Sequence, residues 1–319
     1  MNSTGQLIRL TTFGESHGPA MGGILDGMPP RVHIDLARVQ AEVDRRRPGV
    51  RPLTSQRREP DRVEVLSGIS ADGLTFGTPI GFLVRNEDAR PSDYGQVLRP
   101  NHADYTYLRK YGIHDFSGGG RASARETVSR VIAGAICRQW LERFGIRVEA
   151  RFVETGSVAA AAAEGDSIGG IVEGVVCGLP PGVGEPVYDK LHARLAAAMM
   201  SVNAAKAFEY GDGFRAASMR GSESLDIPSM QQGEPFLSNH SGGIQGGISN
   251  GMPVNFRVYF KPTPTIMRDV DTVDASGHAV TLHPRGRHDP CVAVRAVPVV
   301  EAMALLVVAD LLRISGIRS

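Results

Sequence analysis

The chain has 319 residues, 35 basic and 34 acidic side chains, and a formal net charge of +1. Nucleic-acid coats and polybasic membrane anchors need a summed positive field, so this balance argues against both. An aromatic content of 6% also argues against an RNA-binding protein that stacks bases on aromatic rings. The amino terminus lacks the apolar core of a signal peptide, and no run is apolar enough to span a bilayer, so we expect a cytoplasmic protein.

Only four of the basic side chains are lysine, so arginine supplies nearly all of the positive charge. Arginine holds carboxylate and phosphate oxygens bidentately and stays charged when it is buried. The excess indicates small anionic ligands bound in pockets; a genome that prefers arginine codons is the alternative. Three widely spaced cysteines predict neither a disulfide framework nor a zinc site.

The sequence predicts both β-strands and α-helices. Apolar alternation and β-branched runs predict strands near 5–12, 20–26, 63–69, 79–85, 146–155, 169–179 and 254–261. Helical spacing of apolar residues predicts helices over about 35–46, 123–145, 189–206 and 298–315. Strands interleaved with helices, without a strict βαβ alternation, indicate an α+β layered fold.

Local signals support these helices. Asp35 is expected to cap the first helix, and Ser123 with Glu126 reads as a capping box for the second. Pro298 is placed in the first turn of the fourth helix, where proline is favoured. The alanine-rich run 159–163 predicts a capped loop or a single helical turn.

Two loop histidines are candidates for proton transfer, because an unperturbed imidazole titrates near pH 6.5. His17 lies in GESHG at 14–18, where glycines on both sides permit a tight turn that presents Ser16 and His17. His102 lies in RPNHADYTY at 99–107, beside Arg99, in a segment that we predict to be a loop. A surface histidine and a turn that satisfies its own polar groups are the respective alternatives.

The segment GGGRASARET at 118–127 carries the clearest anion-binding signal. Three glycines lead into a predicted helix start, so free backbone N–H groups and the positive end of the helix dipole would face a ligand bound in front of the helix. Arg121 and Arg125 flank that entry and Ser123 adds a hydroxyl. The segment lacks a Walker lysine and the dinucleotide glycine spacing, so it supports neither an ATPase nor a Rossmann protein.

The remaining motifs are individually ambiguous. The three consecutive arginines at 45–47 suit the carbonyl end of a helix, where positive charge is favoured. Their side chains cannot all point in one direction, so one or two could instead reach a neighbouring site. In PRGRHDPC at 284–291, Asp289 follows basic residues and is expected to stay ionised, as a base or an orienting group. A metal site is disfavoured because neither HEXXH nor paired cysteines occur. The loops SNHSGGIQGG at 238–247 and KPTPT at 261–265 suit a flat or phosphorylated ligand, or ordinary turns.

Taken together, these segments resemble the chorismate synthase family. The resemblance rests on an ordered series covering nearly the whole chain: GESHG, DRRRPG, QRREPD, RPNHADYTY, GGGRASARET, EGDSIGG, SVNAAK, SNHSGGIQGGISNG, KPTPT and GRHDPC. It implies one domain over 1–319 with a β-α-β sandwich core, assembled as a homotetramer. It further implies reduced FMN as cofactor and an anti-1,4-elimination of phosphate from 5-enolpyruvylshikimate 3-phosphate to give chorismate.

The resemblance also implies residue roles. His17 would protonate the departing phosphate, His102 would stabilise the charged flavin, and Asp289 would help with the ring proton, with the Ser16 and Ser123 hydroxyls assisting. Substrate carboxylates and phosphate would be held by Arg47, Arg99, Arg125 and Arg287. The flavin would contact Arg121, Ala122, Ser123, Asn203, Ala204, Gly246, Lys261, Pro262, Thr263, Pro264, Thr265 and Arg287. NADPH could reduce the flavin, with Arg46 as its contact, or a separate reductase could do so.

The chain departs from the family pattern in three places. Relatives commonly have glycine where Asn101 stands and often serine where Ala122 stands; asparagine tolerates unusual backbone angles, and position 122 contributes its backbone, so we expect little effect. The link 156–164 is shorter than in relatives, which could alter the oligomer surface. The second nicotinamide-contacting arginine of relatives has no clear counterpart.

Overall fold

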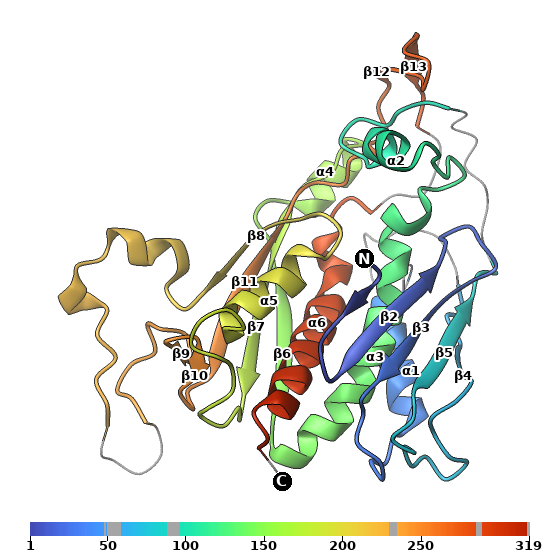
Figure 1. Ribbon diagram of the computed structural model, residues 1–319. Helices are drawn as coiled ribbons and strands as arrows, with labels where there is room; N and C mark the ends of the chain where they lie inside the picture. Colours follow the sequence, from blue (N-terminus) through green and yellow to red (C-terminus); the bar gives the residue numbers. More distant parts are fainter. Residues whose placement is uncertain (48, 50–58, 88–95, 230–234, 285–288, 318–319) are drawn as a thin grey trace.

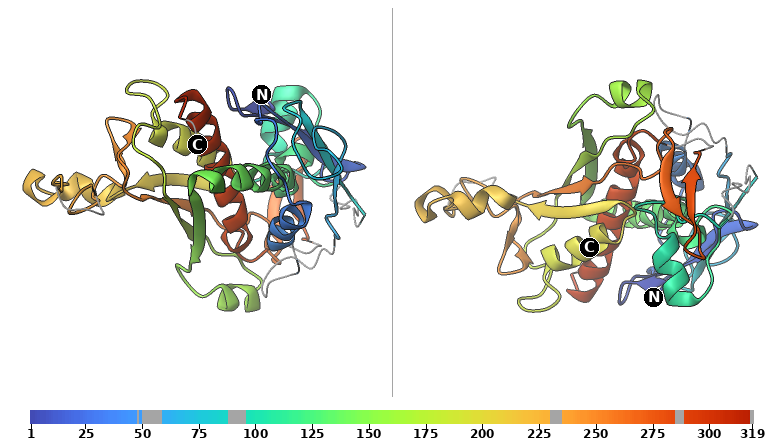
Figure 2. Two further views of the ribbon diagram at one scale, coloured as in Figure 1. Left: turned by 90° about the horizontal axis from the view of Figure 1, so that it is seen from below. Right: turned by 90° about the horizontal axis from the view of Figure 1, so that it is seen from above.

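The computed structural model describes residues 1–319 except 48, 50–58, 88–95, 230–234, 285–288 and 318–319. Its body is a layer of helices between two antiparallel sheets (Figures 1 and 2). The α+β sandwich expected from the sequence is therefore confirmed. In the part of the chain that is described, no helix is both long and apolar enough to cross a membrane.

The first sheet is formed by the amino-terminal part of the chain. Its strand order is β1 (Ser3–Thr4), β2 (Arg9–Gly14), β3 (Ala20–Asp26), β5 (Ile80–Arg85) and β4 (Val63–Val65). Every neighbouring pair is antiparallel. Helices α1 (Leu36–Arg46) and α3 (Thr127–Leu141) pack together, and α3 covers the buried face of β2, β3 and β5.

The second sheet closes the other side of the helical layer. Its order is β6 (Arg147–Val153), β7 (Gly170–Cys177), β11 (Val254–Phe260) and β8 (Ala205–Tyr210), again antiparallel throughout. Along β7 the residues alternate between buried and half-buried, as expected for a strand with one face on the core. Helices α5 (Leu191–Met200) and α6 (Ala293–Ile314) cover this sheet.

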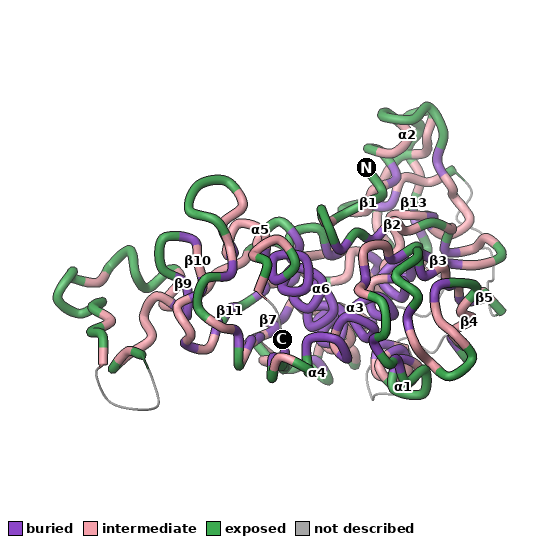
Figure 3. The backbone as a smooth tube through the Cα atoms, turned by 60° about the horizontal axis from the view of Figure 1, so that its bottom comes forward, coloured by how far each residue is buried: buried purple, intermediate pink, exposed green. Residues whose placement is uncertain are grey.

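Helix α6 is the central element of the core. Almost every residue from Ala293 to Leu312 is buried (Figure 3), because the mainly apolar helix is enclosed by α1, α3, α5 and the second sheet. It crosses α3 at close range, because a Cβ at Gly134 would lie 2.5 Å from Cα and Cβ of Ala302. Two buried acids interrupt the apolar surface, and both are satisfied. Glu301 accepts hydrogen bonds from arginines of α1 and α3, and Asp310 accepts three backbone N–H groups of residues 6–8.

Several smaller elements complete the fold. Short hairpins are formed by β9 (Ile244–Gln245) with β10 (Ile248–Ser249) and by β12 (Val270–Val273) with β13 (Ala279–Leu282). Helix α2 (Asp104–Tyr111) lies above the body, and α4 (Val158–Ala163) occupies the alanine-rich link. The 3₁₀ turns are η1 (Gly120–Ala122), η2 (Ala124–Glu126), η3 (Glu142–Phe144), η4 (Gly213–Ser218) and η5 (Gly221–Glu223); the last two lie in an arm that projects from the body (Figure 1).

Four local predictions were wrong. The helix expected to reach residue 206 ends at Met200, because Ala204 takes a positive φ of 68° and the chain then enters β8. The last helix begins five residues before Pro298, because proline is tolerated in early turns and marks a helix start only approximately. The segment 99–107, expected to be a loop, contains the start of α2.

The fourth concerns the capping box. The Ser123 hydroxyl accepts a hydrogen bond from the Arg125 amide at 3.3 Å, but it caps η2 rather than α3. The Ser123 amide donates to the Gly120 carbonyl, and the Glu126 carboxylate instead pairs with Arg130 at 2.7 Å. Serine and glutamate at this spacing are therefore used for a 3₁₀ entry and an ion pair.

Candidate active site

The GESHG motif forms a tight turn between β2 and β3. The Gly18 amide donates to the Glu15 carbonyl at 3.0 Å, which closes a turn with Ser16 and His17 at its centre. Gly14 enters this turn with φ of 97°, in a region that favours glycine. The Ser16 side chain is fully buried and its Oγ lies 3.0 Å from Nδ1 of His17. The predicted glycine-flanked turn is therefore present, but Ser16 is buried behind it instead of being presented.

Two consecutive glycines bring the two candidate histidines together. A Cβ at Gly118 would overlap Nδ1 and Cε1 of His17, and a Cβ at Gly119 would lie 2.8 Å from Cε1 of His102. The imidazoles thus pack against adjacent residues of one backbone segment, although they come from turns 85 positions apart in the sequence. Any larger residue at these positions would displace a ring. The glycine run therefore shapes the wall of the site as well as preceding a helical entry.

Asp104 organises the second histidine. Its carboxylate lies 2.5 Å from Nδ1 of His102 and accepts hydrogen bonds from Nε and Nη2 of Arg99 at 2.8 and 2.7 Å. Nε2 of His114 lies 2.9 Å from the same carboxylate. Burial alone would raise the pKa of Asp104, but the hydrogen bonds and charges of His102 and Arg99 outweigh burial and hold that pKa well below its usual range. A carboxylate on Nδ1 fixes the ring and leaves Nε2 to face Gly119.

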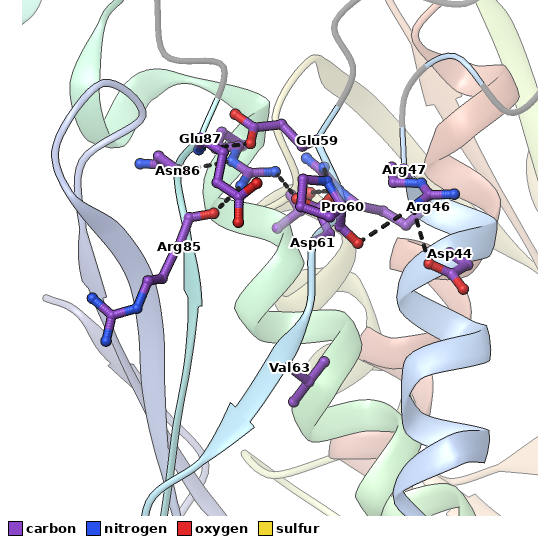
Figure 4. Close-up of polar contacts among 12 residues, drawn as sticks. Asp44, Arg46, Arg47, Glu59, Pro60, Asp61, Val63, Arg85, Asn86 and Glu87 are labelled. Atoms are coloured by element: carbon purple, nitrogen blue, oxygen red, sulfur yellow. Dashed lines mark hydrogen bonds and ion pairs between the residues drawn. The ribbon is translucent and has the colours of Figure 1, made fainter.

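The arginine triplet at the end of α1 points in three directions, as its consecutive spacing predicted. Arg45 pairs with Glu301 in the core, and Arg47 approaches Asp44 at 3.6 Å on the surface (Figure 4). Arg46 turns inward: only 1% of it is exposed, and Nη2 donates to the Ala124 carbonyl at 2.6 Å.

Arg46 joins a buried cluster with Asp61 and Arg125. Asp61 lies 3.8 Å from Nη1 of Arg46 and 2.5 Å from Nη1 of Arg125, and all three side chains are buried. The pKa of Arg46 is lowered to about 9: burial is the largest cause, the charges of Arg295 and Arg125 act in the same direction, and those of Asp61 and Asp289 oppose them. Arg46 therefore remains protonated at neutral pH, within a cluster of net positive charge.

Asp289 approaches this cluster from the amino-terminal end of α6. Its carboxylate is 5% exposed and receives Nε and Nη2 of Arg295 at 2.6 and 2.5 Å. Asp289 is therefore held in a close contact with the Arg295 guanidinium. Because Asp289 and Arg295 act electrostatically on Arg46, segments near residues 46, 125 and 289 meet in one region.

The segments expected to hold the flavin are linked by hydrogen bonds. Asn203 donates from Nδ2 to the Ala122 carbonyl at 3.0 Å, and its Oδ1 is buried without a hydrogen-bond partner among the described residues. Lys261 donates from Nζ to the carbonyl of Asn101, whose φ of 57° is a left-handed conformation. The Thr263 hydroxyl is likewise buried without a described partner.

Arg121 lies between the glycine run and the amino-terminal strands. Its Nη2 donates to the Thr12 hydroxyl at 2.6 Å, and its side chain helps to line a cavity of about 270 Å³ bounded by the amino terminus, α3, α5 and α6. Pro262 and Pro264 stiffen the loop after β11, and the Thr263 carbonyl accepts a hydrogen bond from Ser167. Thr265 ends this loop and is buried.

Among the described residues predicted to hold the flavin, Gly246 lies apart from Asn203. Gly246 lies in the turn between β9 and β10, and the neighbouring Gly247 carbonyl accepts from the first residue of α5. Asn203 lies beyond the last residue of that helix, so the two positions are separated by roughly 13 Å of helix. Arg287 lies outside the described residues.

The structure adds residues that sequence reasoning passed over. Asp104 and Asp61 occur within the motifs RPNHADYTY and QRREPD, but nothing in those strings shows that both are buried and bonded to arginine. Asn86 and Arg295 carry no motif signal at all. Among the described residues, no group of three or more histidine, cysteine or acidic side chains is placed to hold a metal ion.

The assembled site combines two imidazoles, a buried aspartate and several buried guanidinium groups at the entry to α3. Such a site stabilises negative charge that develops on a leaving group and supplies a proton to it. The fold and the site thus define an enzyme that performs acid–base chemistry on a small, multiply anionic ligand.

Comparison with known proteins gives the family. A sequence model described as chorismate synthase matches residues 8–162 and 155–312. Chorismate synthases of Porphyromonas gingivalis and Synechococcus sp. (strain WH7803) are 49% and 50% identical, covering 97% and 99% of this chain and 95% and 98% of their own lengths. A crystal structure of chorismate synthase superposes with a TM-score of 0.76 at 29% identity, covering 97% of this chain and 92% of that one. The chain belongs to the chorismate synthase family.

The activity follows from this membership. The enzyme is a phosphate-eliminating carbon–oxygen lyase that converts 5-enolpyruvylshikimate 3-phosphate into chorismate, the final step of the shikimate pathway towards the aromatic amino acids. The family uses reduced FMN.

Proposed function

We propose that elimination takes place at the wall formed by Gly118 and Gly119, with His17 and His102 on its two sides. The packing of both imidazoles against these adjacent glycines carries the proposal. His17 delivers a proton to the departing phosphate, and the buried Ser16 hydroxyl orients its ring from the Nδ1 side. His102, fixed by Asp104, contributes a polar or charged Nε2 next to the bound cofactor.

Arginines supply the field that holds the substrate. Its two carboxylates and phosphate need several cationic donors. Arg99 lies beside Gly119, and Arg125 is bonded through Asn86 to the turn that carries His17. Arg47 and Arg287 complete the proposed set. Arg125 already bonds Asp61 and Asn86, so it contributes mainly through its charge unless those bonds rearrange. The same field favours phosphate release because it stabilises the leaving dianion.

The cofactor segments fit a flavin. Asn203 Oδ1 and Thr263 Oγ1 are buried acceptors without described partners, and a bound ring system with polar edges would satisfy them. Arg121, Ala122, Ser123, Ala204 and the loop Lys261–Thr265 would complete its surroundings. Reduced FMN supplies an electron-rich ring that permits C–O and C–H cleavage without net redox change. Asp289, held by Arg295, would assist removal of the ring proton.

The position of Gly246 favours a tetramer. Within one chain it lies at the opposite end of α5 from Asn203. We assign it to the site of a neighbouring subunit in a homotetramer. Sedimentation equilibrium tests the assembly: a monomeric, fully active enzyme would contradict it.

Reduction of the flavin is a separate proposal. The burial of Arg46 favours a structural role over direct contact with NADPH, so we assign reduction to a separate reductase in the cytoplasm. An anaerobic assay with NADPH and oxidised FMN as the sole reductant system tests this assignment. Chorismate formation under those conditions would show that the enzyme reduces its own flavin.

The roles of the histidines are tested by phosphate release under anaerobic conditions with reduced FMN. We expect His17→Ala and His102→Ala each to lower kcat by roughly 10²–10⁴-fold, the usual contribution of a positioned proton donor. His278→Ala, in the exposed β12–β13 hairpin, is the matched control and should retain full activity. A wild-type kcat in both site variants would remove the assigned roles.

A further inference from the structure

Asn86 follows β5 directly and contacts the turn that carries His17. Its amide nitrogen Nδ2 donates to the Glu15 carbonyl at 3.1 Å and to the Gly18 carbonyl at 2.7 Å. Its backbone N–H donates to the Pro19 carbonyl at 3.0 Å. The side chain thus joins both ends of the four-residue turn and holds the turn to the end of β5 in the first sheet.

The other side of the same amide faces the buried cluster. Oδ1 of Asn86 accepts a hydrogen bond from Nε of Arg125 at 2.9 Å, and Arg125 is paired with the fully buried Asp61 (Figure 4). Asp61 is itself held in a left-handed backbone conformation, with φ of 46°, and its carbonyl accepts from Gln40. A chain of three side chains therefore runs from helix α1 to the turn.

Only an amide satisfies both sides at this position. Two donated hydrogen bonds are needed on the carbonyl side and one acceptor on the guanidinium side, and asparagine provides both within one short side chain. A carboxylate of the same shape would keep the bond to Arg125 but would place an oxygen against two carbonyl oxygens.

We infer that Asn86 is a positioning residue for the elimination, which holds Ser16 and His17 in register with the site through the Asp61–Arg125 ion pair. It touches no reacting atom and acts through His17, so the inference rests on the proposed role of His17. Tightly held supporting groups matter because a displacement of about 1 Å at a catalytic group costs on the order of 100-fold in rate.

The test uses Asn86→Asp in the full-length enzyme. The anaerobic phosphate-release assay should show kcat lowered roughly 10–100-fold with KM changed less than about threefold, because substrate contacts remain while the proton donor is misplaced. The matched control is Gln139→Glu, another buried amide that bridges backbone groups, here of Asp35. It lies roughly 18 Å along α3 from Thr127, so it should leave kcat unchanged.

A second readout does not depend on turnover. The Gly18 amide, bonded to the Glu15 carbonyl, should exchange with solvent at least tenfold faster in Asn86→Asp than in the wild type, and the ring ¹⁵N resonances of His17 should shift. Gln139→Glu should change neither. Unchanged Gly18 exchange and an unchanged His17 ring in Asn86→Asp would overturn the inference, whatever the rate.

The two outcomes separate this inference from the role of His17. If His17→Ala keeps full activity while Asn86→Asp loosens the turn, the proton-donor role fails and the structural link stands. If Asn86→Asp does not fold, the inference is tested by hydrogen exchange in the wild-type enzyme. The side-chain amide protons of Asn86 should exchange at least tenfold more slowly than those of an exposed asparagine. Exchange at the exposed rate would overturn the inference.

Discussion

Replacing Asp104 by asparagine tests the organisation of the site. The wild-type carboxylate accepts two hydrogen bonds from the Arg99 side chain and one from its backbone, and it lies 2.5 Å from His102 and 2.9 Å from His114. The substitution keeps the shape but removes the charge, and the new NH₂ group faces donors. Arg99 then loses the buried carboxylate with which it pairs.

The magnitude follows from this burial. Removing one partner of a buried ion pair costs about 3–5 kcal/mol of unfolding free energy. For a chain of this length, that corresponds to a decrease in Tm of about 5–8 °C. Asp274→Asn is the matched control, because its partner His278 is 79% exposed in side-chain area and such a pair contributes about 1 kcal/mol or less.

The pH dependence has a definite sign. The folded-state pKa of Asp104 is lower than the unfolded value of about 3.9, so its stabilisation is fully present at neutral pH and is lost as the pH falls below about 4. The difference in Tm between wild type and Asp104→Asn should be largest near pH 7 and should shrink on acidification below pH 4.

Activity completes the test. The same exchange behind a catalytic histidine of serine proteases lowers kcat about 10⁴-fold, because the ring takes the wrong tautomer. We expect a decrease of roughly 10²–10⁴-fold in phosphate release, measured well below the Tm of the variant. A decrease in Tm with unchanged kcat would show that Asp104 stabilises the fold without serving His102. An unchanged Tm would refute the ion-pair argument itself.

Two further predictions concern packing and the cofactor. Gly134→Ala should lower the unfolding free energy by about 1–3 kcal/mol, because its Cβ would meet the α6 backbone at Ala302; Gly221→Ala, with open space around it, should change it by less than about 0.5 kcal/mol. Urea denaturation measures both, and equal effects would contradict the close α3–α6 crossing. Thr263→Val should leave Tm unchanged, because the hydroxyl has no described partner, but should weaken binding of reduced FMN by roughly three- to tenfold in an anaerobic titration. Unaltered affinity would place the hydroxyl outside the cofactor site.

The sequence by itself determined much of the architecture and the chemistry of this protein. Periodicity located the main strands of both sheets, with 20–26 matching β3 residue for residue, because a period of two is imposed wherever one strand face is buried. The sequence misplaced the end of α5 and the start of α6. The left-handed conformation of Ala204 and the place of Pro298 inside α6 both depend on surrounding contacts. The motifs also indicated which side chains could carry protons and which could bind anions.

Tertiary structure decided how those side chains work together. Three features depend on contacts between remote segments. Gly118 and Gly119 support two histidines from distant turns, and Asp104 and Asp61 are buried partners of arginine. Asn86 ties the His17 turn to Arg125. Local sequence carries no information about such contacts, because the free energy of a buried charge or amide depends on the partners that the fold brings to it.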